Sequence, residues 1–213
     1  AVQTLRVNDR QGLQPIALPE IDYRRRFADL AGGLLQLQVN SLALTRTDGQ
    51  DTQRALEAVS AAAGPVEGGA TLLGAYLEGP YLNAVRAGAQ DPDLIRPADR
   101  AEATRLLDRG VVRVLAVAPE VEENRWLVAE AAARGLTVSA GHTDATYDQA
   151  LQAVEDGVRH VTHAFNAMRP LGHREPGMLG AALVVAELRC ELVADNVHVH
   201  PAAMRLLVAA KGT

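Results

Sequence analysis

The sequence predicts an α/β protein built around a parallel sheet. Strand-like segments begin at residues 72, 111, 136, 158 and 190, and most of them are followed by a helical pattern. The strands are continuous apolar runs, which is the pattern of strands whose two faces are both buried. Such alternation is typical of βα units joined into one sheet.

The N-terminal residues have a different pattern, because turn-forming residues interrupt them. Gly12, Pro15 and Pro19 follow a short alternating segment at residues 4–7. This indicates short strands and turns rather than βα units. We therefore expect a small β subdomain over residues 1–35 and a larger α/β domain over residues 36–213.

The junction near residue 40 lacks turn chemistry, although two strand-like segments, 34–40 and 41–45, meet there. No residue lies between the two segments to form a turn. Our hypothesis is that residues of a longer chain are missing between Asn40 and Ser41, and that further residues follow Thr213.

The remaining elements follow from caps, apolar runs and helix-stopping glycines. A helix is expected from Gly49 to Gly64, with Asp51 or Thr52 as its N-cap. The expected strands cover residues 72–77, 111–117, 136–140, 158–162 and 190–194, and the later helices cover 98–109, 121–134, 145–156 and 201–210. A closed barrel and an open doubly wound sheet both fit this alternation of strands and helices. A barrel needs eight strands and about 250 residues, so part of it would lie outside this sequence.

Composition excludes several classes of protein. The 213 residues are 48% hydrophobic and carry a net charge of −5, which argues against a nucleic-acid or anionic-membrane partner. The one cysteine, Cys190, cannot form an intrachain disulfide, and this suits a reducing compartment. No apolar run approaches the length of a membrane span. We therefore expect a cytoplasmic protein.

Three side chains suited to metal binding stand where predicted strands end. Glu78, His142 and His163 should converge, because the carboxyl ends of parallel strands meet at one edge of the sheet. Two imidazoles and one carboxylate form a catalytic zinc set that leaves a position for water and lowers its pKa to about 7. Singly, each residue is better explained as a solvated or packed loop side chain. Their shared position favours the metal site.

Further polar residues lie in loops near the same edge. Arg174 stands in a segment bounded by glycine and proline, 172–177, where a guanidinium is suited to bind phosphate. His198 and His200 follow the last expected strand, so one could touch a ligand and the other cap the next helix. Residues 86–90 form another loop that could line the mouth of the site.

Five segments resemble, in order, motifs of the N-acetylglucosamine-6-phosphate deacetylases of the amidohydrolase superfamily. They are LEGPYLN (77–83) with GAQ (88–90), SAGHTDA (139–145), THAFNAM (162–168), REPG (174–177) and ADNVHV (194–199). The resemblance extends over residues 70–213. Because five motifs occur in the family's order, it is highly specific.

The resemblance implies a fold, a metal and a reaction. The family has a TIM-type (β/α)8 barrel with a small β domain, so residues 36–213 would be part of a hydrolase barrel. One divalent metal ion per chain, commonly zinc, would be bound by Glu78, His142 and His163. The reaction would be hydrolysis of the acetamide of N-acetylglucosamine 6-phosphate to glucosamine 6-phosphate and acetate. The residues implied to contact this amino-sugar phosphate are Ala89, Gln90, Asn166, Ala167, Arg174, Asp195, Asn196, Val197 and His198. In such enzymes the arginine can reach a neighbouring subunit, which implies a homodimer.

Three departures from the family keep alternatives open. Gln90 stands where many members have a histidine that polarises the acetyl carbonyl. Gln38 and Asn40 stand where the superfamily often has a His-x-His pair, which favours one metal ion. The family's catalytic aspartate would lie beyond Thr213, so the catalytic acid or base is unknown. The alternatives are another amidohydrolase, acting on a cyclic amide or another N-acyl sugar, and a catalytically inactive sugar-phosphate-binding relative.

Overall fold

The computed structural model describes residues 50–65 and 71–212, preceded by four strands between residues 16 and 45. The chain divides into two units, Ala1–Gly49 and Gln50–Thr213, and each is described by itself. The domain boundary expected after residue 35 stays a prediction. The strand-like segment at residues 4–7 lies outside the described residues.

The first unit contains two antiparallel pairs of strands. β1 (Ile16–Ala17) pairs with β4 (Leu44–Thr45), and β2 (Ile21–Ala28) pairs with β3 (Leu34–Ser41). The register of the longer pair runs from Ile21 opposite Ser41 to Ala28 opposite Leu34. β3 continues through the junction of Asn40 and Ser41, and the hypothesis of missing residues there stays a prediction.

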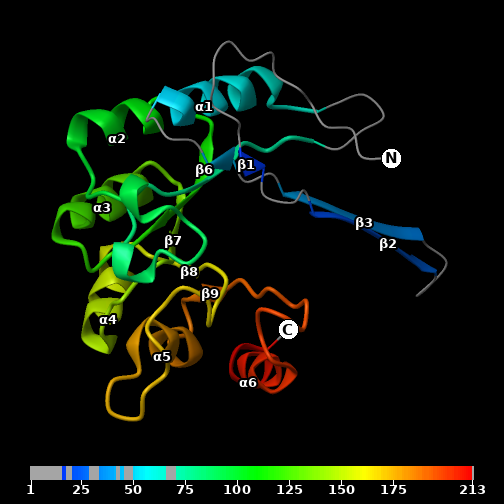
Figure 1. Ribbon diagram of the computed structural model, residues 1–213, viewed down its shortest axis with the longest axis vertical. Helices are drawn as coiled ribbons and strands as arrows, with labels where there is room; N and C mark the ends of the chain where they lie inside the picture. The colour runs from blue at the N-terminus through cyan, green and yellow to red at the C-terminus, as the bar shows by residue number, and fades with distance from the viewer. Residues whose placement is uncertain are drawn as a thin grey trace. The chain divides into compact units, whose positions relative to one another are not determined.

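The second unit is built on a parallel sheet of five strands. In chain order and in space they are β5 (Ala75–Glu78), β6 (Val112–Val117), β7 (Thr137–Ala140), β8 (His160–Val161) and β9 (Arg189–Cys190) (Figure 1). Every strand pairs with the one before it, so these five strands contain no reversal of order. A doubly wound sheet requires such a reversal.

The helices alternate with the strands, and several of them begin at a side-chain cap. α1 (Gln50–Ala62) precedes the sheet. The later helices are α2 (Arg100–Leu107), α3 (Arg125–Ala133), α4 (Tyr147–Asp156), α5 (Gly177–Val184) and α6 (Pro201–Lys211), with short 3-10 turns η1 (Ala84–Arg86), η2 (Pro92–Leu94) and η3 (Glu122–Asn124). The Asp99 side chain caps α2, and Thr146 with Gln149 forms a capping box at α4. Helices α2 to α5 lie along one side of the sheet (Figure 1).

Several elements differ from the sequence-based expectation. The strand expected over residues 72–77 is β5 (Ala75–Glu78), and the strand expected over 158–162 is limited to β8 (His160–Val161). The strand expected over residues 190–194 ends at Cys190, so residues 191–194 belong to the loop that follows. Helix α5 was not expected, because its sequence GMLGAALV has no polar face and therefore no helical period. Residues 177–182 of this helix are all buried. An all-round apolar helix of this kind is stable only inside a core.

The core holds the strand ends in place. Leu115 and Val117 of β6, Leu127 of α3 and Val161 of β8 are completely inaccessible to solvent. Each buried side chain of this size contributes about 1.5–3 kcal/mol through the hydrophobic effect. In the part of the chain that the structure describes, no helix has the length and hydrophobicity to cross a membrane.

Candidate metal centre

The three predicted metal ligands meet at the carboxyl edge of the sheet. Glu78 is the last residue of β5, and His142 and His163 each lie two residues beyond β7 and β8. Glu78 Oε1 is 2.7 Å from His142 Nε2 and 3.0 Å from His163 Nε2, and the two Nε2 atoms are 3.1 Å apart. One ligand atom from each residue lies within 4.8 Å of the others. These atoms can therefore share a single cation.

Hydrogen bonds on the other ring nitrogen set the orientation of both imidazoles. His142 Nδ1 lies 3.0 Å from the Arg86 carbonyl oxygen, and His163 Nδ1 lies 3.2 Å from that of Asn166. A carbonyl only accepts, so each Nδ1 carries a hydrogen and donates it. Each Nε2 is thereby directed at Glu78, as in metal sites whose histidines are fixed by an outer hydrogen bond.

The protonation of the cluster agrees with this arrangement. Burial favours the neutral form of Glu78, but the hydrogen bonds from His142 and His163 outweigh it and lower the pKa of Glu78 to about 2. Burial lowers the pKa of His163, yet the hydrogen bond and charge of Glu78 raise it above its usual value overall. Without a metal ion, a proton on Nε2 of His163 links that imidazole to the Glu78 carboxylate. A divalent cation fits the place of that proton.

The backbone around the two histidines is unusual. His142 and His163 have positive φ angles of 46° and 30°, a region that non-glycine residues rarely adopt. Gly141 precedes His142, and a Cβ atom there would collide with Cγ2 of Thr162. The close approach of these two loops brings the imidazole rings together in an edge-to-face arrangement, with centroids 4.8 Å apart.

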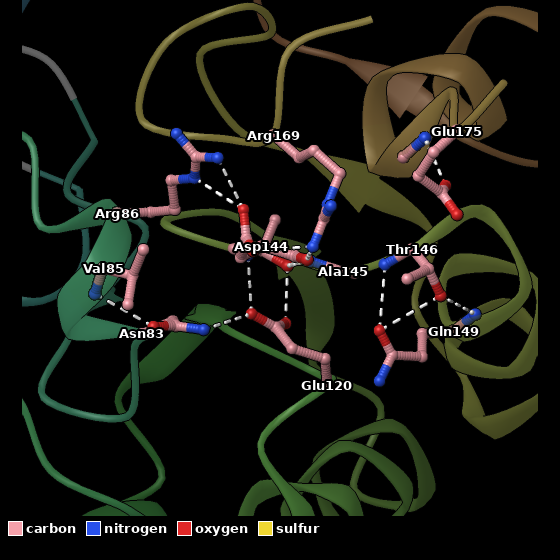
Figure 2. A network of polar contacts seen from close by, with 12 residues as sticks. Asn83, Val85, Arg86, Glu120, Asp144, Ala145, Thr146, Gln149, Arg169 and Glu175 are labelled. Carbon is pink, nitrogen blue, oxygen red and sulfur yellow. Dashed lines mark hydrogen bonds and ion pairs between the residues drawn. The ribbon is translucent and has the colours of Figure 1, made fainter. Parts of the chain in front are cut away.

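A polar network surrounds the loop that carries His142 (Figure 2). The Glu120 carboxylate accepts hydrogen bonds from the Thr143 hydroxyl at 2.5 Å, the Asp144 backbone N–H at 2.6 Å and the Asn83 amide at 2.9 Å. Glu120 thus links the loop after β5 to the loop after β7.

The residues implied to contact substrate fall into two groups. Ala89 and Gln90 follow Gly88, where an added Cβ would lie 3.0 Å from the Ala167 Cβ and 3.4 Å from the His142 ring. The backbone of this turn therefore lies against the His142 loop, while Ala89 itself is exposed and Gln90 is half-buried. Asn166 belongs to the metal centre, since its carbonyl accepts from His163.

The second group lies on the surface of the described structure. Arg174 and the residues from Asp195 to His198, including Asn196 and Val197, are exposed. Asp195 binds His198 Nδ1 at 2.6 Å, and the hydrogen bonds from His198 and Val197 lower the pKa of Asp195 to about 2. His200 does not join them, because its Nδ1 accepts from the Ala202 N–H and caps α6. No hydrogen bond among the described residues joins Arg174 or this segment to the three predicted ligands.

The sequence reasoning missed Glu120, although a signal was present. Glu120 lies three residues beyond the apolar strand β6 and Glu78 is the last residue of β5, and carboxylates at or just beyond the ends of buried strands reach the same edge. Arg169 was also missed, since a single arginine after an apolar loop has no distinctive pattern.

Fold and site together define a class: an α/β protein with a parallel sheet and a candidate two-histidine, one-carboxylate metal centre at the strand ends. Comparison with known proteins identifies the relatives. The chain is 40% identical over 147 residues to the N-acetylglucosamine-6-phosphate deacetylase of Bacillus subtilis, covering 68% of this chain and 37% of the relative. It is 41% identical over 140 residues to the N-acetylgalactosamine-6-phosphate deacetylase of Escherichia coli O157:H7, covering 65% and 37%. No family model matches the chain.

Solved structures give the same result. The N-acetylglucosamine-6-phosphate deacetylase from Mycobacterium smegmatis superposes with a TM-score of 0.69 at 36% identity, covering 76% of this chain and 42% of the other. The enzyme from Pasteurella multocida gives 0.72 at 30% identity, covering 78% and 43%. The resemblance to the N-acetylglucosamine-6-phosphate deacetylases is confirmed, and the matched part of the chain belongs to that family. The chain spans 37% of the length of the two curated relatives.

Proposed function

We propose that this protein hydrolyses the acetamide of N-acetylglucosamine 6-phosphate, giving glucosamine 6-phosphate and acetate. The proposal is carried by one observation: Glu78, His142 and His163 converge at the strand ends of a chain 40% identical to a deacetylase. A variant of the Mycobacterium smegmatis enzyme has been solved in complex with N-acetyl-D-glucosamine-6-phosphate, and it superposes with a TM-score of 0.70.

One divalent metal ion per chain fits the three side chains, and zinc is our choice because imidazole and carboxylate ligands suit it. When bound, such an ion activates water at neutral pH and polarises a carbonyl. Glu78 and the two imidazoles, whose orientation is fixed by hydrogen bonds on Nδ1, would hold the ion. Burial of His142, which is 4% exposed, limits competition from solvent on that side.

The loops beside the ligands supply the substrate contacts in this proposal. The Gln90 amide would donate a neutral hydrogen bond to the acetyl oxygen, where negative charge develops during attack. Ala89, Asn166 and Ala167 would surround the acetamide, because the loops that hold them pack beside His142 and His163.

The phosphate end is assigned to Arg174 and to the segment of Asp195, Asn196, Val197 and His198. Their exposure suits groups that meet a substrate, or a neighbouring subunit, at the surface. A homodimer follows as part of the proposal, with Arg174 of one subunit reaching the other site.

The complete fold is proposed to be a (β/α)8 barrel. The chain-order arrangement of β5 to β9 supports this, as do helices lying along one side of the sheet. None of the residues implied by the resemblance serves as general acid or base, so that role stays unassigned in this proposal. The cytoplasm stays the predicted location.

N-acetylgalactosamine 6-phosphate is the second candidate substrate, because a deacetylase for that sugar is 41% identical to this chain. Both sugars share the acetamide and the phosphate, and they differ only in the orientation of one hydroxyl group. Acetate release from the two substrates at equal concentration decides between them by the ratio of kcat/KM.

The test of the substrate class is Arg174→Ala. A guanidinium–phosphate pair makes charge-assisted bonds worth about 1.5–3 kcal/mol each, so kcat/KM for N-acetylglucosamine 6-phosphate should fall about ten- to a hundredfold. Unphosphorylated N-acetylglucosamine should be hardly affected. Arg174→Lys keeps the charge without the fork and should recover part of the loss. Equal losses of kcat/KM on both sugars would refute the phosphate role of Arg174.

Absence of acetate release from the metal-loaded wild-type protein would favour a non-catalytic binding protein.

A further inference from the structure

We propose that Asp144 is a positioning residue of the metal centre, which holds the Arg86 carbonyl against His142 and thereby sets the affinity for the metal ion. The inference rests on the proposed metal site and adds a residue for which the sequence suggested no such role. It is carried by the contacts of Asp144 with two arginines from different loops (Figure 2).

The first step is the contact of Asp144 with Arg86. Oδ1 of Asp144 accepts from Nε of Arg86 at 2.7 Å and lies 2.6 Å from Nη2, so two nitrogens of the guanidinium contact one carboxylate oxygen. Arg86 closes the 3-10 turn η1, and its own carbonyl accepts from His142 Nδ1 at 3.0 Å. Arg86 thus contacts the His142 loop twice: its side chain binds Asp144, and its backbone carbonyl orients His142, two residues earlier.

The second step is the contact of Asp144 with Arg169. Oδ2 of Asp144 lies 2.6 Å from Nη2 of Arg169, and the Asp144 carbonyl accepts from Nε and Nη2 of that arginine at 2.9 and 2.8 Å. The Arg169 backbone N–H donates to the Thr143 carbonyl at 3.1 Å. Asp144 therefore joins the loop after β8 to the loop after β7.

The third step concerns the backbone that these contacts hold. His142 has a positive φ of 46°, and its carbonyl accepts from the Asn83 N–H at 3.0 Å. A residue in this region returns to an extended conformation unless its surroundings hold it. Asp144 and Glu120 lie next to each other in Figure 2, where the Asp144 N–H donates to Glu120 at 2.6 Å, and together they restrain this loop.

An ordinary surface ion pair is the alternative to this role. Exposed pairs contribute little, because water screens the charges. Asp144 differs, since its side chain is 25% exposed and its partners, at 29% and 31%, are also largely covered. The carboxylate also has a charged partner on each oxygen. A pair with this geometry acts on the position of its loops rather than only on surface charge.

The decisive variant is Asp144→Asn, which keeps the size of the side chain and removes its charge. Zn²⁺ affinity of the apo protein, measured by competition with a chromophoric chelator, should fall about ten- to a hundredfold, as for other outer partners of metal-ligating histidines. The slowly exchanging Nδ1–H proton of His142 in the NMR spectrum of the zinc-loaded protein should broaden or vanish. A merely structural role would not move that signal.

Three further variants make the test specific. Asp108→Asn breaks a more exposed Asp–Arg pair, with Arg134 at 2.7 Å, which touches no residue of the metal centre, and should leave zinc affinity unchanged. Arg86→Lys should show an intermediate loss, because an ammonium keeps the charge but not the fork. The double variant of Asp144→Asn with Arg86→Gln should lose no more zinc affinity than the single variant that binds zinc more weakly, because both changes remove the same contact between Asp144 and Arg86.

The outcomes separate this proposal from the one on which it rests. Wild-type zinc affinity in Asp144→Asn, or an equal loss in Asp108→Asn, would overturn the positioning role. If Asp144→Asn fails to fold, the two variants of Arg86 carry the test. Wild-type zinc affinity in both Arg86→Lys and Arg86→Gln would overturn the positioning role, whereas a smaller loss in Arg86→Lys than in Arg86→Gln would support it. Retention of zinc by His142→Ala would instead show that the metal centre itself is misplaced.

Discussion

Replacing Asn124 by leucine should destabilise the second unit substantially, because this buried side chain joins three segments. Asn124 is completely inaccessible to solvent. Its Oδ1 accepts from the Ala98 N–H at 2.9 Å, and its Nδ2 donates to the carbonyls of Tyr81 and Ala118 at 2.9 and 3.0 Å. Tyr81 follows the Glu78 strand, so the same residue supports the loop beside the metal centre.

The magnitude follows from which groups lose their last partner. The Tyr81 carbonyl keeps a bond from the Ala118 N–H at 3.0 Å, and the Ala118 carbonyl keeps one from Val121 at 3.4 Å. Losing the hydrogen bond to each of these two carbonyls costs about 0.5–1.5 kcal/mol. The Ala98 N–H is left buried without a partner, which costs about 1–3 kcal/mol. The expected loss in the free energy of unfolding is therefore about 2–6 kcal/mol.

Urea denaturation followed by tryptophan fluorescence measures this loss. Trp126 is the only tryptophan of the sequence, and it lies in α3, two residues after Asn124. Gln152→Leu is the control, because Gln152 is exposed on α4 and its change should stay within about 0.5 kcal/mol. A loss below about 1 kcal/mol for Asn124→Leu would refute the reasoning that these buried bonds are irreplaceable.

Three more predictions concern the metal centre and the cysteine. Elemental analysis should find about one zinc or similar ion per chain, and His142→Ala or His163→Ala should remove most of it, because two protein ligands rarely hold zinc; two tightly held ions would contradict this. Gln90→Ala should lower kcat about tenfold or more without changing the metal content, and an unchanged kcat would exclude the proposed hydrogen bond. Cys190, whose pKa is raised mainly by burial, should react with iodoacetamide at pH 8 about tenfold more slowly than glutathione does, and equal rates would contradict the burial.

The sequence predicted the strands and the three converging side chains because both depend on local, periodic signals. Apolar runs mark buried strands, and a polar residue after such a run lies at the sheet edge whatever the rest of the chain does. Glu78, His142 and His163 follow this rule, although 85 residues separate the first from the last. The helices of α2, α3 and α4 carry caps or stopping glycines that are equally local.

The features that escaped prediction depend on tertiary contacts. The end of β9 at Cys190 is set by pairing with β8, which itself has only two residues. Helix α5 has no period to detect, since it is apolar on all sides. The partners of Asp144 come from three separate loops, and nothing in the sequence states which arginines reach which carboxylate.

Backbone strain links the unpredicted network to the predicted ligands. Of the described non-glycine residues, five have positive φ, and four of these, His142, His163, Phe165 and Ala167, belong to the two histidine loops. Such conformations cost about 1–3 kcal/mol each and persist only where the surroundings hold them. The bonds from Glu120, Asp144 and Arg169 converge on these loops. The strain places both Nε2 atoms within reach of one carboxylate oxygen, so the network holds in place a geometry that a relaxed backbone would lose.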